Sequence, residues 1–192
     1  MSPILTGVIA SGISGNLTPP WSPEGAYDAL ATVTVPAGGA ATVTFAGIPN
    51  TYKHLQIRAI AKNTLTNVYT ANFYMRFNGD TGTNYSNHAI YGTGSSVVPN
   101  IPTGANPSFA IWGLSGSSQF AGHIIDILDY ANTSKNKTTR ILMGTDTSSG
   151  GYLGLESGAW MNTSAINSIS FSMGDGTQTI AQYSQFSLYG VK

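Results

Sequence analysis

The sequence predicts an all-β domain: a β-sandwich of jelly-roll type, preceded by an extended N-terminal arm. Three observations support this prediction. Apolar and polar residues alternate with a period of two along most of the chain, Gly- and Pro-containing turn signals separate these runs, and no window has the 3.6-residue spacing of an amphipathic helix. The 10 Tyr, 7 Phe and 3 Trp stand among many β-branched residues, which also favours sheet.

Residues 1–28 are expected to form the arm. Pro19, Pro20 and Pro23 disfavour both helix and central strand in this segment. The segment is nevertheless more apolar than an ordinary linker. It is therefore either a disordered tail or an extended arm that docks on a neighbouring subunit, and we favour the arm. The residues expected to make its contacts are Ile4, Leu5, Val8, Ile9, Ile13, Leu17 and Trp21.

Residues 29–192 are expected to form the sandwich. The first two runs, 29–35 and 40–45, flank Pro36-Ala-Gly-Gly39, which is a hairpin signal. The next two runs, 54–62 and 71–77, alternate cleanly. They place two sets of side chains in the core: Leu55, Ile57, Ala59 and Ala61 from the first, and Phe73, Met75 and Phe77 from the second.

The second half of the domain continues in the same manner. Strand-like runs cover 109–114, 119–130, 138–144, 158–161, 165–173 and 179–191, and residues 92–108 are expected to form a long loop. Roughly eight to ten strands without helices are typical of a sandwich. The long connection suits two Greek keys better than an up-and-down barrel, so the prediction is a jelly roll.

Charge is the unusual feature of the composition. Asp, Glu, Lys and Arg make up 8% of the chain, against about 25% in ordinary soluble domains. The net charge is zero, which argues against a nucleic-acid partner because phosphate binding needs a basic patch. No apolar stretch is long enough for a membrane helix, so no membrane partner is expected. Either hydroxyls and amides solvate the surface or other subunits cover it. We favour covered surfaces in a self-assembling protein, with a homotrimer expected.

The sequence offers no catalytic residues, and an enzyme is not expected. Asp126 and Asp129 are three residues apart on a strand, so they point to opposite faces and are expected to pair with neighbours such as Arg140 or to end the strand. The histidines at 54, 88 and 123 lack metal-ligand spacing. The chain has no cysteine, which excludes thiol catalysis and disulfides. No cofactor is expected.

Two groups of residues are candidates for binding. Asp80, Asn78 and Asn84 gather oxygen atoms in a Gly-rich loop and form a weak calcium candidate. A structural turn is the favoured interpretation, because one carboxylate is too few for a tight site. The second group is available for contact with carbohydrate or protein, two alternatives that the sequence does not separate: Tyr85, Tyr91 and Trp112.

Several segments together resemble a known class of protein. They are Ile9–Leu17, Ile48–Arg58, Arg76–Tyr85, Asp126–Thr133, Gly158–Asn162 and Ser187–Lys192. Over nearly its whole length the chain resembles small structural proteins of tailed bacteriophages and prophages. The resemblance implies a virion protein, with three positions open: capsid cement (decoration) protein, head spike or fibre, or tail component. It supplies no catalytic residues. The expected partners are the major capsid protein or other virion proteins, and the expected location is the capsid surface.

Overall fold

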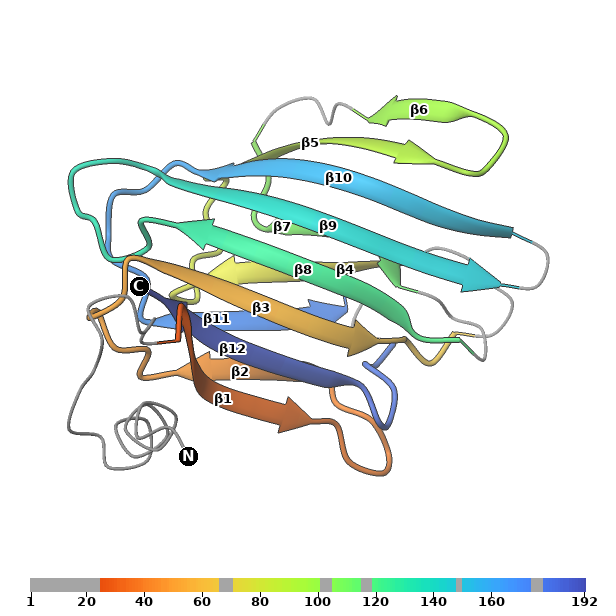
Figure 1. Cartoon of the computed structure of the whole chain (residues 1–192), viewed down its shortest axis with the longest axis horizontal. Coiled ribbons are helices and arrows are strands. Elements are labelled where there is room, and N and C mark those ends of the chain that lie inside the picture. Colours follow the sequence, from red (N-terminus) through yellow and green to blue (C-terminus); the bar gives the residue numbers. More distant parts are fainter. Residues whose placement is uncertain (1–24, 66–70, 101–104, 115–118, 148–149, 174–177) are drawn as a thin grey trace, which may run out of the picture.

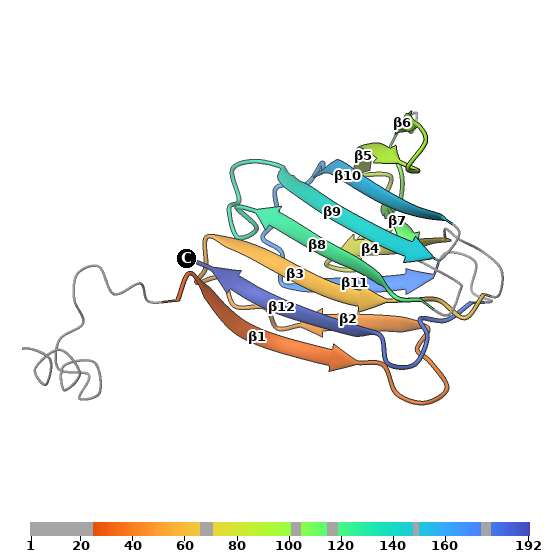
Figure 2. The same cartoon turned by 45° about the vertical axis from the view of Figure 1, so that its right-hand side comes forward.

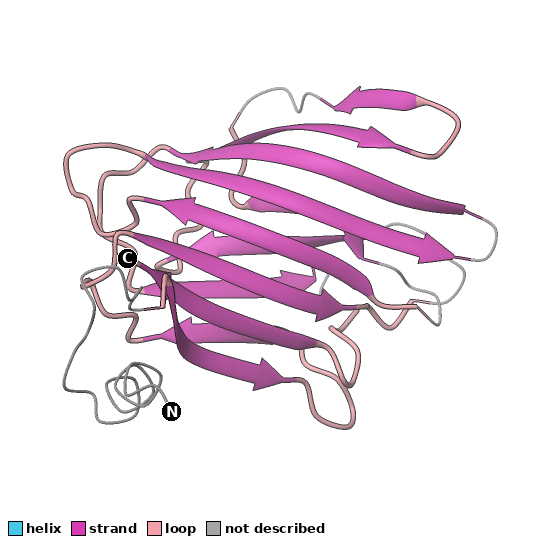
Figure 3. Ribbon diagram, viewed as in Figure 1, coloured by secondary structure: helices cyan, strands magenta, loops and turns pink. Residues whose placement is uncertain are grey.

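The computed structural model describes residues 25–65, 71–100, 105–114, 119–147, 150–173 and 178–192, which form twelve strands and no helix (Figure 3). All strand pairs are antiparallel. The strands lie in two sheets that face each other, with the larger in front in Figures 1 and 2. The expectation of an all-β sandwich is therefore confirmed.

The two sheets differ in size. The larger sheet has eight strands in the order β1 (Tyr27–Thr34), β12 (Gln185–Val191), β3 (His54–Ala61), β8 (Ala121–Leu128), β9 (Lys137–Thr147), β10 (Gly150–Trp160), β5 (Tyr85–Gly92) and β6 (Val97–Asn100). The smaller sheet has four strands in the order β2 (Thr42–Ala46), β11 (Ser168–Met173), β4 (Ala71–Phe77) and β7 (Phe109–Leu114). The finer assignment to the jelly-roll type stays a prediction.

The core lies between the sheets and follows the expected alternation. The side chains of β3 and β4 predicted to face inward are buried as predicted, at Leu55, Ile57, Ala59, Ala61, Phe73, Met75 and Phe77. Aromatic rings join the two layers at the centre. The Phe171 ring from the smaller sheet lies 5.0 Å from the Phe186 ring of the larger one, and Phe73 contacts both. Such pairs stabilise a core beyond the area that they bury.

The predicted hairpin at Pro36–Gly39 is wrong. The turn itself forms, since the Gly39 amide donates to the Pro36 carbonyl at 3.1 Å. However, β1 pairs with β12 in the larger sheet while β2 pairs with β11 in the smaller one. The connection therefore carries the chain from one layer to the other. A turn signal indicates that the chain reverses, and it does not indicate which strand the next segment joins.

The region around residues 85–108 also differs from the prediction. β5 was not expected, and β6 lies inside the segment expected to be a loop. The inward positions of β5 include Asn87 and Ala89, so its alternation of hydrophobicity is weak. β6 contains Pro99 and lies at the edge of the sheet, where a missing amide is tolerated. No helix among the described residues is long and apolar enough to cross a membrane.

Candidate docking surface

The outer face of the larger sheet carries exposed aliphatic side chains. Ile124, Leu142, Leu155 and Ile90 lie directly opposite one another on the adjacent strands β8, β9, β10 and β5. Ile60 of β3 and Leu153 of β10 lie on the neighbouring row. The six are exposed by between 38% (Ile124) and 65% (Leu153). We call the set Ile60, Ile90, Ile124, Leu142, Leu153 and Leu155 the outer apolar stripe.

Glycines make a hollow beside this stripe. In the row that contains Ile60 and Leu153, the two positions between them are Gly122 and Gly144. Without side chains there, the sheet is depressed between Ile60 and Leu153, and the depression has a volume of about 470 Å³. We call it the glycine hollow. A second depression of about 610 Å³ lies on the other side of Ile124 and Leu142, toward Arg140 and His88. The outer face therefore has a raised apolar row with a recess on each side.

The charged groups next to the stripe have partners within the same sheet. Asp126 accepts a hydrogen bond from Gln56 Nε2 at 2.8 Å, and Gln56 Oε1 accepts one from Arg58 Nε at 2.9 Å. The Arg58 guanidinium lies over the rings of Tyr27 and Tyr189, 5.5 and 5.2 Å from their centroids. Covering the stripe would therefore leave these groups hydrogen-bonded, which reduces the free-energy cost of burying them.

Arg140 is held in the same manner. Its Nη1 donates to Ser157 Oγ at 2.8 Å, and the residue lies opposite Asp126 in the register of β8 and β9. The expectation that Asp126 lies beside Arg140 agrees with this register. Asp126 and Asp129 do not face one cleft, because Asp129 follows the end of β8 in a left-handed backbone conformation with φ of 49°.

The outer face of the smaller sheet has the opposite chemistry. Thr44, Ser170 and Arg76 lie side by side on β2, β11 and β4, and Thr42, Ser172 and Tyr74 form the next row. None of the large exposed hydrophobic residues of the described chain lies on this face. We call it the hydroxyl face, defined by Thr42, Thr44, Ser168, Ser170 and Ser172. Hydroxyl groups exchange hydrogen bonds with water, so this face is suited to solvent.

The three predicted contact residues have different positions. Tyr85 is wrong as a surface contact: it is fully buried, its ring packs against Trp160 and Phe109, and burial raises the pKa of its hydroxyl to about 12. Tyr91 is half-buried, with its ring centroid 5.8 Å from that of Tyr152. Trp112 lies in β7, and its side chain is outside the described residues.

The loop containing the weak calcium candidate is a hydrogen-bonded turn. The Asp80 carboxylate accepts hydrogen bonds from the Gly82 amide, from Asn84 Nδ2 and from Trp160 Nε1, at 2.8 to 2.9 Å. These donors lower the pKa of Asp80, with Asn84 contributing most. Asn78 lies with its side-chain oxygen toward the amides of Asn167 and Ser168 instead. The oxygen atoms of the three residues therefore serve the turn rather than converging on one point.

A buried acid lies between the sheets. Glu156 is 3% exposed, and its Oε1 accepts a hydrogen bond from Asn87 Nδ2 at 2.9 Å. Its Oε2 has no hydrogen-bond partner in the described part of the chain. Burial raises the pKa of this carboxyl to about 8, although the bond from Asn87 acts in the opposite direction. Its neighbours across the sheet are Ile141 and Ala89. Glu156 is therefore a protonated core residue at neutral pH, without an acidic partner for catalysis.

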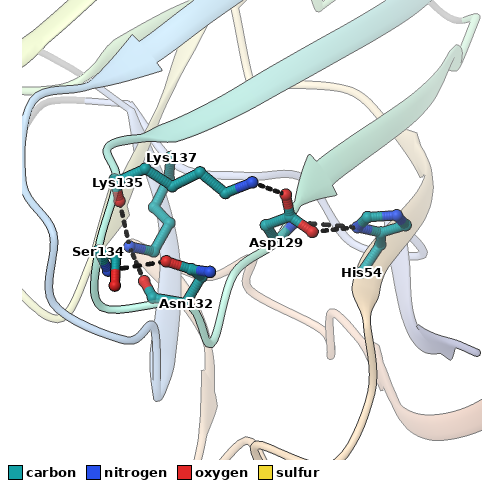
Figure 4. Close-up of polar contacts among 6 residues, drawn as sticks. All are labelled: His54, Asp129, Asn132, Ser134, Lys135 and Lys137. Atoms are coloured by element: carbon teal, nitrogen blue, oxygen red, sulfur yellow. Dashed lines mark hydrogen bonds and ion pairs between the residues drawn. The ribbon is translucent and has the colours of Figure 1, made fainter.

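Three charged residues, Asp129, Lys135 and Lys137, lie in and at the end of the loop between β8 and β9 (Figure 4). Lys137 is fully buried, and its ammonium donates to the carbonyls of Asn132, Lys135 and Thr163 at 2.6 to 3.0 Å. Burial lowers its pKa. Next to it, the hydrogen bond from Lys135 lowers the pKa of Asp129.

His54 takes part in the same loop. Its Nδ1 accepts a hydrogen bond from the Asp129 amide at 2.9 Å and lies 3.5 Å from Asp129 Oδ1. These contacts fix the loop in place, and no group of three or more His, Asp and Glu side chains in the described residues is placed to hold a metal ion.

The predicted arm contacts cannot be compared with the structure in the same way. Ile4, Leu5, Val8, Ile9, Ile13, Leu17 and Trp21 all lie outside the described residues. The described chain begins at Gly25, and β1 begins at Tyr27, inside the last residues of the segment assigned to the arm. Contacts of the arm with a neighbouring subunit stay a prediction.

The outer apolar stripe was not found from the sequence. A signal for it was present, because several strands have apolar residues at consecutive positions, as in Ile124-Ile125 and Ile141-Leu142. On a strand, one residue of such a pair faces outward whichever face is buried. Consecutive apolar pairs on adjacent strands therefore indicate a sheet that is apolar on both sides.

Comparison with known proteins adds little. No protein-family model matches the chain, and no curated protein matches it. Among solved structures, a protein of unknown function from Shewanella oneidensis is 11% identical and is matched over 87% of this chain and 76% of its own, with a TM-score of 0.23. That similarity carries no argument. The functional conclusion must rest on the molecule itself.

Proposed function

We propose that this chain is a structural protein of a tailed-phage virion, most specifically a capsid cement or decoration protein that stabilises the head by bridging capsomers. One observation carries the proposal: one outer face of the sandwich has a recessed stripe of exposed aliphatic side chains, whereas the opposite outer face has rows of Thr and Ser on β2 and β11. A protein that sits on a particle needs one face for its neighbours and one for water. The resemblance of the sequence segments to phage structural proteins supports the same function.

The stripe is suited to a permanent contact. Burying an exposed Leu or Ile side chain contributes about 1.5–3 kcal/mol, and the six stripe residues are each about half exposed. Contiguous apolar patches on a sheet face mark association sites. The low charge of the chain fits this function, since charged groups are depleted where subunits pack. The proposal includes a homotrimer on the capsid surface, in contact with the major capsid protein, with no cofactor and no enzymatic activity.

Binding to particles tests the proposal. Purified protein is added to undecorated heads assembled from the major capsid protein of the same phage, and bound copies are counted after sedimentation. We expect the wild type to bind to saturation and Leu155→Asp to lose at least tenfold in affinity. Thr44→Asp, which places the same charge on the hydroxyl face, is the matched control and should bind as the wild type does. If the wild type fails to bind, the proposed function is refuted. If the two variants bind with equal affinity, the stripe is not the docking face.

One observation supports an alternative function, the binding of a host receptor or glycan. A groove of about 600 Å³ is lined by Phe120, Tyr152, Asp146 and Thr93, among others. Aromatic rings beside an acid and a hydroxyl are the usual chemistry of carbohydrate recognition. A head-spike or tail-fibre module that binds a host receptor or glycan would use this groove. A glycan array with wild type and Tyr152→Ala tests it: signals lost in the variant would support this alternative, and an empty array would eliminate it.

A further inference from the structure

We infer that the outer apolar stripe and the glycine hollow receive residues 1–24 of a neighbouring copy of this chain. This inference rests on the proposed function only in requiring that copies of the chain assemble with one another. It names the occupant of the docking surface, which the proposed function leaves open.

The chemistry of the segment and of the surface match. Residues 1–23 contain no Asp, Glu, Lys, Arg or His. The stripe likewise has no charged member, and Asp126 and Arg140 beside it each have a hydrogen-bond partner within the sheet. An uncharged segment with aliphatic residues and one Trp can therefore cover the stripe without bringing a further charge to be buried.

The hollow suits a side chain that protrudes from such a segment. Gly122 and Gly144 form its floor, and Ile60 and Leu153 form its sides. At about 470 Å³ the hollow accommodates one large apolar side chain with space for the backbone above it. Alternate residues of an extended segment face the same side. The side chain two positions along the segment would therefore contact the raised row of Ile124 and Leu142 beside the hollow.

The direction in which the chain before Tyr27 leaves the sheet favours docking on a neighbouring copy over docking on the same chain. Tyr27 at the start of β1 pairs with Val191, and Val191 pairs with His54 at the start of β3. The glycine hollow lies beside Ile60, toward the other end of β3, which is about 20 Å away along the strand. Residues that precede Tyr27 thus leave the sheet at the end remote from their own hollow. Twenty-four residues span up to about 80 Å when extended, so they can reach an adjacent copy without the reversal of direction that their own hollow would require.

Cysteine pairing tests this inference, and the chain provides a clean background because it has no native cysteine. Three arm variants are prepared in the full-length protein, Val8→Cys, Ile13→Cys and Leu17→Cys. Each is mixed with Leu155→Cys and mildly oxidised in solution without particles, and the cross-linked peptides are identified by mass spectrometry. The matched control replaces Leu155→Cys with Thr44→Cys, an exposed position on the hydroxyl face.

We expect at least one arm position to cross-link to position 155 about tenfold more than to position 44. Equal yields at 155 and 44 would overturn the inference. So would predominant pairing of 155 with 155, which would show that two copies meet stripe to stripe. The double variant Ile13→Cys/Leu155→Cys distinguishes the remaining possibility. A cross-link that leaves the polypeptide at the mass of a monomer under denaturing, non-reducing conditions joins residues of one chain and would also overturn the inference.

This experiment is independent of particle binding. If wild type binds heads and Leu155→Asp does not, while no arm residue cross-links to the stripe, the proposed function stands and the inference about the arm fails. If the arm cross-links to the stripe and the wild type does not bind heads, the chain assembles through its arm in some other setting.

Discussion

The two sheets differ in the residue types on their outer faces, although their inner faces are similar in composition. Most inward positions of both sheets are aliphatic or aromatic, as at Ile125 and Ile141 in the larger sheet and Phe171 in the smaller. The exposed large aliphatic side chains lie on the outer face of the larger sheet, whereas Thr and Ser occupy the outward positions of β2 and β11 in the smaller. Folding requires only the inward set. The outward set is therefore free to reflect what each face contacts, and the contrast points to a covered face and a solvated one.

If the inner and outer faces differ in this way, the largest difference in the free energy of unfolding is expected between substitutions at two adjacent residues that point to opposite sides of the sheet. Ile141 is 2% exposed and Leu142 is 42% exposed. Ile141→Ala should lower the free energy of unfolding by about 2–5 kcal/mol, because it leaves a cavity in the core. Leu142→Ala should change it by about 1 kcal/mol or less, since its side chain is largely outside. Urea unfolding at low protein concentration measures both. Similar losses for the two would show that the stripe is part of the core.

The inner face of the larger sheet also holds polar side chains, among them the acid Glu156. Its pKa is raised from the usual 4.5 to about 8 in the fold. Its contribution to stability is therefore complete below pH 4.5 and is lost as pH rises through 8. Glu156→Gln keeps an acceptor for Asn87 and cannot ionise. We expect it to match the wild type near pH 4 and to exceed it by about 5 kcal/mol above pH 8, at about 1.4 kcal/mol per pKa unit.

Thermal or urea unfolding across that pH range checks the prediction. Parallel profiles for wild type and Glu156→Gln would mean that the carboxyl ionises without cost in the folded protein. A variant that is less stable at every pH would mean that the protonated acid makes a contact that the amide does not replace.

A smaller effect is expected where the turn after β4 meets the larger sheet. Asp80 follows β4 and accepts the hydrogen bond of Trp160 from β10. Asp80→Ala leaves the buried indole N–H unpaired, and we expect a loss of about 1–3 kcal/mol. Because the pKa of Asp80 is lowered below 3.8, its contribution is present above that value. It is lost as pH falls through the folded pKa, so the difference between variant and wild type should diminish in acid.

Asp146→Ala is the control for this measurement, because Asp146 is exposed on β9. Its removal should change unfolding by about 0.5 kcal/mol or less. Equal effects at Asp80 and Asp146 would show that the turn does not connect the two layers.

The sequence was sufficient to predict many of the core residues on the inner faces, but not the exposed aliphatic residues on the outer face of the larger sheet. Clean alternation on β3 and β4 made Leu55, Ile57, Phe73 and Met75 predictable as core. It failed on β5, where Asn87 occupies an inward position. It also could not show that β1 and β2 enter different sheets, because strand pairing depends on partners more than 100 residues away, β12 and β11. The stripe is assembled from five strands, β3, β8, β9, β10 and β5, whose order only the fold reveals.

The smallest change in stability is expected when the chemistry of the two faces is exchanged. Thr44 and Ser170 are opposite each other on the hydroxyl face, as Leu142 and Leu155 are on the stripe. Thr44→Ile/Ser170→Ile should leave unfolding within about 1 kcal/mol, since β-branched residues suit strands. It should strengthen self-association. Leu142→Thr/Leu155→Thr should weaken self-association by tenfold or more.

Sedimentation velocity over a range of concentrations measures association in both variants. If the isoleucine pair on the hydroxyl face associates no more than the wild type, exposed aliphatic residues alone do not create a docking surface here. The specific shape of the stripe and hollow would then be the deciding feature.

The floor of the glycine hollow has a consequence for the evolution of the chain. A Cβ atom added at Gly122 would meet no other atom within 4 Å, so the fold itself does not forbid a side chain at this position. Glycine inside a strand is unfavourable by about 0.5–1 kcal/mol relative to alanine. Selection for stability alone would therefore replace it. If glycine persists at this position among descendants of this gene, selection must act on the empty space above it.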